Sequence, residues 1–329
     1  MLGVLLSDCS LEPFRFARQT RLFHEAAQWL PPRSFALSPL PTFPLLSPLP
    51  AFVFDGQEWK EELCEIQLWW DRLSGLPNPL FHQQRLRALE QAGQLVLSNP
   101  SALTMLCWDK WQTFELCRRY RIPTPPTFLL TETSSLEVSA PCWLKPRRGG
   151  EGRGVERWAR WEPALRERAL ELGRAQPEQW LLQEELLWRE GTPGDELRIW
   201  LQRNRGGGWE MTAAWKAAPK NQQANLSRGG AYVGMESVVW DSELGELCRR
   251  FLKALEKELS AQEWGLCCEF VLDWLPVAEG WALLEANSKP GRSLDRLGTE
   301  EAREARHRLV TSPVLYLHQW LKEQGRGGC

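Results

Sequence analysis

The chain has 329 residues, enough to bury the cores of two or three domains. Its formal net charge of −2 and isoelectric point near 6.2 give no electrostatic basis for nucleic acid as a partner. The nine cysteines contain no CxxC pair and the four histidines are far apart, which argues against a zinc site and against histidine-based nucleophilic catalysis. No segment approaches the roughly 20 apolar residues of a membrane span, and the opening segment lacks the basic flank of a signal peptide, so we expect a soluble, cytoplasmic protein.

Short strands alternate with helices in the first part of the chain. We expect strands at residues 2–6, 52–54 and 95–97, and helices at about 11–30, 58–72 and 83–92. The proline-rich segment at 31–50 predicts loops around short strands, because proline cannot continue a helix. This alternation favours an N-terminal α/β domain with a parallel sheet at residues 1–98.

A glycine-rich segment follows the next predicted elements, which are a helix at 103–119, a proline stop at 122–127, and strands at 128–130 and 142–146. Lys145 lies at the end of the last strand, and four glycines come shortly after it: Gly149, Gly150, Gly152 and Gly154. Glycines let backbone N–H groups approach phosphate oxygens closely. We therefore expect a hairpin lid over phosphates with Lys145 beneath it; the alternative is a surface hairpin whose arginines face solvent.

The following strands are joined by glycine-rich turns. Strands at 180–186, 196–201 and 209–218 predict antiparallel pairing, and helices are expected at 162–174, 241–260 and 300–323. Arg198 lies among apolar neighbours and therefore needs an anionic partner, either a structural carboxylate or a nucleotide phosphate. Residues 325–329 are expected to be a disordered tail.

A hairpin at 269–292 contains the strongest chemical signal. Its two apolar runs are separated by a turn at 276–280, and each run ends in a carboxylate, Asp273 and Glu285. Residues two apart on a strand face the same side, so Glu285 and Asn287 should point together, with Asp273 on the adjacent strand. Two carboxylates and an amide oxygen suit Mg²⁺. The alternative is a solvated hairpin whose acids face water.

The order of these features resembles that of an ATP-grasp enzyme. The co-linear segments are Asp109-Lys110-Trp111, the turn at 123–127, Leu144-Lys145-Pro146 with the glycines, Gln183-Glu184, Glu196-Leu197-Arg198, the loop at 225–230, and Asp273 with Glu285-Ala286-Asn287. The sequences NLSRGG at 225–230 and LEANSKPGR at 284–292 are most similar to the YheC/YheD group of endospore coat-associated ATP-grasp proteins.

The resemblance implies a role for each matching position. Lys110, Lys145 and the four glycines would contact ATP, and Gln183 and Glu184 would lie on the hinge strand that binds adenine. Arg198 and Lys216 would contact the phosphates as catalytic residues. Asn225 and the loop Arg228–Gly230 would border the acceptor site. Asp273, Glu285 and Asn287 would hold one or two Mg²⁺ ions.

Some positions depart from the family pattern. Glu196-Leu197-Arg198 replaces the family's Asp-Ile-Arg, and Arg147 and Arg148 precede the glycines where smaller residues are expected. Residues 1–98 contain no matching motif, although the family places a small α/β domain there.

The implied architecture is α/β, with an α+β C-terminal part. It consists of a small N-terminal (pre-ATP-grasp) domain at 1–98 and an ATP-grasp domain at 99–324, with a central subdomain at about 125–190 and a C-terminal subdomain at about 191–324.

The implied function is an ATP- and Mg²⁺-dependent ligase. It would activate a carboxylate of a small molecule or peptide as an acyl phosphate for attack by an amine-type acceptor. Two alternatives stay open: a spore-coat or assembly-associated protein with little or no catalysis, and an ATP-grasp kinase. Neither nucleic acid nor a membrane is expected as a partner, and the sequence predicts neither the substrates nor the oligomeric state.

Overall fold

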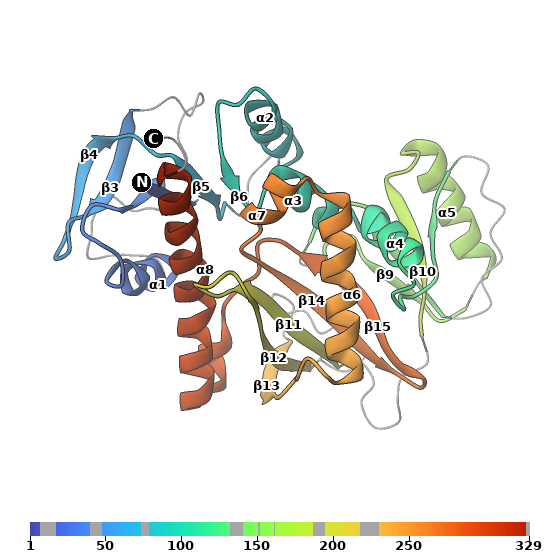
Figure 1. Cartoon of the computed structure of the whole chain (residues 1–329). Helices are drawn as coiled ribbons and strands as arrows, with labels where there is room; N and C mark the ends of the chain where they lie inside the picture. The colour runs from blue at the N-terminus through green and yellow to red at the C-terminus, as the bar shows by residue number, and fades with distance from the viewer. Residues whose placement is uncertain are drawn as a thin grey trace.

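The computed structural model describes residues 1–6, 18–39, 48–73, 79–131, 141–150, 152–160, 162–186, 195–217 and 230–326. The strands in these ranges form sheets of six, four and five strands. In Figure 1 the six-stranded sheet lies in the blue part of the ribbon, the four-stranded sheet in the green part, and the five-stranded sheet in the olive to orange part.

The six-stranded sheet belongs to the first hundred residues and has the strand order β4-β3-β2-β1-β5-β6. Its strands β1, β2, β5 and β6 pair in parallel, whereas β2–β3 and β3–β4 pair antiparallel. The predicted α/β character is confirmed, but the sheet is mixed instead of parallel throughout. The elements of this region are β1 (Leu2–Leu6), α1 (Arg18–Ala27), β2 (Phe35–Pro39), β3 (Leu49–Phe54), β4 (Trp59–Cys64), β5 (Leu68–Asp71), α2 (Pro79–Gln91) and β6 (Leu97–Ser98).

The helix predicted at 58–72 is wrong, because this segment forms the strands β4 and β5. The charged run Lys60-Glu61-Glu62 favours a helix by composition, but β4 is an edge strand, and charged side chains are common where a sheet edge meets water. In β5, Leu68, Trp69 and Trp70 are all buried, as expected for a central strand covered on both faces.

The four-stranded sheet has the order β7-β10-β8-β9, with antiparallel pairing throughout. The single helix predicted at 103–119 is instead two helices, because Asp109 adopts an extended conformation between them (φ −91°, ψ 99°). The elements of this region are α3 (Ser101–Trp108), α4 (Lys110–Arg119), β7 (Thr127–Leu129), β8 (Cys142–Pro146), β9 (Glu156–Trp158), α5 (Pro163–Ala175) and β10 (Trp180–Glu184).

The five-stranded sheet has the order β13-β12-β11-β14-β15 and the predicted antiparallel pairing. Its last hairpin is tighter than expected, since β14 continues to Val277 and β15 begins at Gly280. The last helix also extends two residues into the predicted tail, to Arg326. The elements are β11 (Glu196–Arg203), β12 (Trp209–Ala217), β13 (Ala231–Glu236), α6 (Glu243–Glu258), α7 (Ala261–Leu266), β14 (Glu269–Val277), β15 (Gly280–Asn287), the 3-10 helix η2 (Leu294–Leu297) and α8 (Glu300–Arg326).

Alternation along β11 and β14 gives this sheet two different faces. Leu197, Ile199 and Leu272 belong to a core that includes the apolar side of α6. Trp200 and Val271, on the opposite face, pack with residues of η2 and α8. Arg198 and Gln202 on β11 and Asp273 on β14 occupy other positions of this second face, so the same alternation that builds the core also creates a polar surface.

Asn99 and helix α8 join the N-terminal sheet to the rest of the chain. The Asn99 side chain donates to the carbonyl oxygens of Glu269 (2.7 Å) and Ser288 (2.8 Å) and accepts from the N–H groups of Cys268 (3.0 Å) and Glu269 (3.3 Å). Helix α8 runs beside α1 and contributes Val314 to the core of the six-stranded sheet (Figure 1). No helix of the described residues is both long and apolar enough to traverse a lipid bilayer.

Candidate functional site

Cross-strand pairing places four predicted residues on the polar face of the five-stranded sheet. Arg198 on β11 is opposite Asp273 on β14, and Asp273 is in turn opposite Glu285 on β15. Asn287 follows two residues after Glu285 and therefore faces the same side. The sequence prediction that Asp273, Glu285 and Asn287 share one face is thus supported by the register.

Two buried ion pairs meet at Asp273, whose exposed fraction is 0%. Arg198 binds it with both arms, Nε to Oδ1 at 2.8 Å and Nη2 to Oδ2 at 2.6 Å. The Lys216 ammonium lies 3.2 Å from Asp273 Oδ2 and 2.5 Å from Glu196 Oε2. Of the two partners considered for Arg198, the structure therefore supplies the carboxylate.

The charges in this network shift each other's ionisation. Burial by itself would raise the pKa of Asp273, but Arg198 and Lys216 together outweigh it and hold that pKa well below its ordinary value. Burial raises the pKa of Glu196, and Lys216 opposes this effect without cancelling it. Burial and Arg198 disfavour the charge of Lys216, yet Asp273 and Glu196 keep its pKa above the ordinary value.

A second group of polar residues belongs to the four-stranded sheet. The buried Lys145 ammonium on β8 donates to Gln183 Oε1 on β10 at 2.6 Å, and Gln183 Nε2 donates to Thr127 Oγ1 at 2.9 Å. Glu184, which ends β10, is half-buried, and its N–H donates to the carbonyl of Pro126. The pKa of Lys145 is lowered to about 8, mainly by burial, with the nearby charge of Lys110 acting in the same direction and Glu285 in the opposite one.

Lys110 contacts the base of the glycine-rich segment. Its ammonium donates to the carbonyl of Gly149 at 2.8 Å, and burial lowers its pKa, with Glu285 opposing this shift. The segment connects β8 to its antiparallel partner β9, so the predicted hairpin is confirmed. Gly149, Gly152 and Gly154 have φ angles of 124°, 65° and 70°, a region that residues with a side chain rarely adopt.

Glu285 is the point at which the two sheets come together electrostatically. Its negative charge opposes the lowering of the pKa values of Lys145, on the four-stranded sheet, and Lys110, on the neighbouring helix. The same charge raises the pKa values of Arg198 and Lys216 from the five-stranded sheet. The charge of one predicted metal ligand thus acts on four predicted cations from distant parts of the sequence.

The oxygen atoms near Glu285 suit a hard divalent cation. The Glu285 carboxylate makes no hydrogen bond or ion pair with any of the described residues, and Asn287 Oδ1 accepts one bond, from the Lys289 N–H at 2.8 Å. Asp273 Oδ1 accepts one strong bond, so a lone pair remains on this atom as well. No group of three or more His, Cys, Asp and Glu side chains in the described ranges could hold a metal alone. The available set therefore fits Mg²⁺ completed by water and phosphate oxygens.

The structure adds a residue that the sequence did not single out. The Tyr232 hydroxyl on β13 is buried and has no hydrogen-bond partner among the described residues. Burial raises its pKa, whereas the charges of Arg198 and Lys216 lower it, so the ring lies beside the buried network. The alternation of β13 alone could not show this, because the polar partners come from β11 and β12. The predicted acceptor residues Asn225, Arg228 and Gly229 lie outside the described residues.

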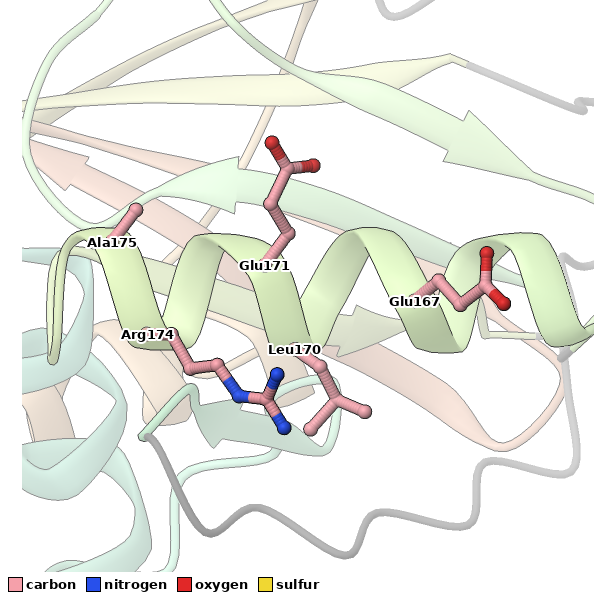
Figure 2. A pocket seen from close by; sticks show the side chains of 5 residues that line it. All are labelled: Glu167, Leu170, Glu171, Arg174 and Ala175. Atoms are coloured by element: carbon pink, nitrogen blue, oxygen red, sulfur yellow. The ribbon is translucent and has the colours of Figure 1, made fainter.

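A surface hollow of about 550 Å³ lies elsewhere, along α5. Figure 2 shows its lining residues, Glu167, Leu170, Glu171, Arg174 and Ala175, all of which come from this helix. None of the predicted site residues lines it. We therefore define the candidate site by the charged residues around Glu285 and not by this hollow.

Known proteins share both the domain and the fold. A family model described as "YheC/D like ATP-grasp" matches residues 165–319, which include the five-stranded sheet but not Lys110, Lys145 or the glycine-rich hairpin. No curated protein matches the chain.

Several solved structures align over nearly the whole chain. A RimK domain ATP-grasp protein from Sphaerobacter thermophilus has a TM-score of 0.57 and 17% identity, covering 96% of this chain and 99% of that one. D-alanine–D-alanine ligase from Bacillus anthracis has a TM-score of 0.58 and 14% identity, covering 99% of both chains. VanG D-Ala:D-Ser ligase from Enterococcus faecalis has a TM-score of 0.59 and 12% identity, covering 96% of this chain and 98% of that one. The protein described here therefore has the ATP-grasp fold and carries a YheC/D like ATP-grasp domain at residues 165–319.

Proposed function

We propose that this protein is an ATP- and Mg²⁺-dependent ligase that activates a carboxylate as an acyl phosphate for attack by an amine-type nucleophile. The observation that carries the proposal is the position of Glu285, whose charge acts on the half-buried Lys110, the buried Lys145 and the Arg198–Lys216 network. The similarity in fold to D-alanine–D-alanine ligase and to D-Ala:D-Ser ligase supports the same reaction class.

The chemistry requires positioning and charge neutralisation more than a protein nucleophile. Lys110 and Lys145 would bind the nucleotide phosphates, with Gln183 and Glu184 near the adenine. The glycine-rich hairpin would cover the phosphates and exclude water from a reactive acyl phosphate. Asp273, Glu285 and Asn287 would hold Mg²⁺, which supplies charge neutralisation between the phosphate oxygens when it is bound.

Arg198 would provide positive charge near the transferred phosphoryl group. Its guanidinium is fixed by the bidentate bond to Asp273, and such preorganised charge stabilises a transition state without reorganisation. Lys216 would support the same charge from β12. We assign Asn225 and the loop at 228–230 to the acceptor side, with the six-stranded domain at 1–98 closing that side of the site.

The carboxylate of Glu285 is the reason to expect a metal requirement. Arg198 and Lys216 are balanced by Asp273 and Glu196, whereas the Glu285 carboxylate has no ion-pair partner among the described residues, although Lys110 and Lys145 act on it from a distance. The phosphates of ATP would be repelled by this carboxylate unless a cation lies between them. Nucleotide binding should therefore depend on Mg²⁺ and on Glu285.

Thermal unfolding with and without an ATP analogue plus Mg²⁺ tests this proposal. Ligand at 100 times its dissociation constant should stabilise the wild type by about 2.7 kcal/mol. Glu285→Gln should fold normally but lose the Mg²⁺-dependent part of this shift. A shift of equal size in both proteins would exclude Glu285 as a metal ligand.

A product assay then distinguishes ligation from phosphorylation. The ligase should release ADP and phosphate only when a carboxylate and an amine acceptor are both present, because the acyl phosphate must be consumed. Isolation of a stable phosphorylated product with a hydroxyl substrate, and no dependence on an amine, would overturn the ligase assignment in favour of a kinase.

A further inference from the structure

Asp109 interrupts the helical segment between α3 and α4 and has an exposed fraction of 0%. Its Oδ1 atom accepts from the backbone N–H groups of Trp111 (3.1 Å) and Gln112 (3.3 Å), and it thereby caps α4. A helix cap requires one side-chain oxygen, which asparagine or serine provides without a charge. The buried negative charge of Asp109 therefore points to a further role.

Two arginines at the base of the glycine-rich hairpin bind this charge. Arg147 Nε lies 2.8 Å from each oxygen of Asp109. Arg148 approaches Oδ2 with both Nε (3.1 Å) and Nη2 (2.9 Å). Hydrogen bonds between ionised groups are stronger than neutral ones, and the low exposure of all three side chains reduces screening by solvent. These contacts fasten the hairpin base to the break between α3 and α4.

Backbone contacts join the same two segments as these ion pairs. Asp109 and Arg148 form an isolated antiparallel β-bridge, and the Lys110 N–H donates to the Arg147 carbonyl at 3.0 Å. Lys110 directly follows Asp109, and Lys145 lies two residues before Arg147 on β8. The same contacts therefore hold the backbone next to both lysines that would bind the phosphates in the proposed site.

The fastened region ends at Gly149. This glycine has a φ angle of 124°, and a Cβ atom built at Gly149 or Gly150 would meet no other atom within 4 Å. Glycine changes its backbone angles at little cost. The ion pairs of Asp109 thus hold the hairpin as far as Arg148, and the next two residues are glycines, which is the arrangement of a hinge.

We propose that Asp109, Arg147 and Arg148 form a charge clamp that sets the hinge of the glycine-rich lid at Gly149 and positions Lys110 and Lys145 for the nucleotide phosphates. Asp109 is a positioning residue, because it acts through the two arginines and the neighbouring lysine. The identification of the ligand as a nucleotide rests on the proposed function, whereas the clamp itself can be tested without nucleotide. The arginines that depart from the family pattern thereby acquire a function specific to this chain.

Two variants separate the clamp from the helix cap. Asp109→Asn keeps an oxygen for capping α4 but removes the charge, whereas the double variant Arg147→Gln/Arg148→Gln keeps Asp109 and removes its partners. Arg168→Gln is the matched control, since Arg168 pairs with Glu156 and Glu171 in the same part of the molecule but not with Asp109. The readouts are the rate of tryptic cleavage after the exposed Arg153 in the lid, followed by mass spectrometry, and the dissociation constant of an ATP analogue with Mg²⁺.

Both clamp variants should be cleaved after Arg153 roughly tenfold faster than the wild type without nucleotide, because the lid base opens more often. Their nucleotide dissociation constants should rise by about tenfold, since displaced lysines lose contact with the phosphates. Arg168→Gln should match the wild type in both measurements. If both variants unfold at lower temperature but keep the wild-type cleavage rate, the three residues are structural and the proposal is wrong. If the wild type binds no nucleotide, the proposed function fails, and the cleavage rates without nucleotide alone decide the clamp.

Discussion

The ammonium of Lys145 donates a hydrogen bond of 2.6 Å to Oε1 of Gln183 on the neighbouring strand. Gln183 is neutral, so this bond orients Lys145 without compensating its charge. Only 5% of Lys145 is exposed, and its pKa falls to about 8, mainly through burial. A buried lysine that titrates near physiological pH makes nucleotide binding sensitive to pH.

We expect the affinity for an ATP analogue to fall as the pH rises above about 8, because neutral Lys145 no longer attracts phosphate. At pH values well above this pKa, the affinity should fall by close to tenfold per pH unit, because the charged fraction of Lys145 falls at that rate. Titration calorimetry from pH 7 upward measures it. Lys145→Arg is the control, since an arginine stays charged in this range, and its affinity should not follow the same curve.

Lys145 also affects stability in a direction that can be worked out. Its folded pKa of about 8 lies below its ordinary value of 10.5, so the unfolded chain binds the proton more tightly between these pH values. The free energy of unfolding should therefore rise with pH across this window, and charged Lys145 destabilises the fold below it. Lys145→Gln should remove this rise in urea denaturation. A rise of the same size in the variant would assign the effect to other groups.

Replacing Asp273 by asparagine should destabilise the protein by about 3 kcal/mol at neutral pH, because Arg198 and Lys216 lose their shared buried partner. The pKa of Asp273 is lowered, so its stabilising effect is present above its ordinary value of 3.8 and is lost as the pH falls through the folded pKa. The difference between wild type and Asp273→Asn should accordingly shrink in strong acid. Denaturant titrations at both pH values compare the two proteins, and an equal difference at each would contradict this explanation.

Asn99 should contribute strongly to the junction between the N-terminal sheet and the remaining chain. It has a φ angle of 51° and makes four side-chain hydrogen bonds across the junction. Asn99→Ala should lower the free energy of unfolding by about 3 kcal/mol, combining lost bonds with backbone strain. Asn99→Gly relieves the strain but not the lost bonds, so it should lie between alanine and wild type. Calorimetry of the wild type, Asn99→Ala and Asn99→Gly measures the order of their stabilities.

Gly245 and Gly265 offer a matched pair of glycines in helices. A Cβ atom at Gly245 would lie 2.3 Å from the carbonyl oxygen of Val239, whereas at Gly265 its nearest neighbour would be 3.7 Å away. Gly245→Ala should therefore destabilise the protein by roughly 2 kcal/mol or more. Gly265→Ala should be neutral or stabilising by about 0.5 kcal/mol, because alanine restricts the unfolded chain. Equal unfolding temperatures for the two variants would contradict the packing around Gly245.

The sequence predicts the last hairpin well because its chemistry and its periodicity agree. Alternation placed Asp273, Glu285 and Asn287 on one face, and the strands pair in that register. The extended strand at 196–201 and its antiparallel partner at 209–218 follow from the same rule. Local patterns suffice where neighbouring strands are joined by short turns.

Contacts between distant segments limit what the sequence alone predicts. Residues 58–72 have the charges of a helix, yet pairing with β3 and β1 makes them strands. The break at Asp109 depends on Arg147 and Arg148, which are almost forty positions away. The partner of Arg198 was correctly limited to two kinds of anion, but the choice between them required the register of β11 and β14.

The position of helix α8 has a consequence for the order in which parts of the protein can fold during synthesis. Val310, Val314 and Leu317 belong to the same core as Leu2, Phe35 and Trp70, so this core joins the first strand to the last helix. During synthesis the six-stranded sheet emerges from the ribosome long before these residues do, and until then the part of its α1 face that α8 contacts stays uncovered. We expect the folding of the N-terminal sheet to be completed only when the last helix is released.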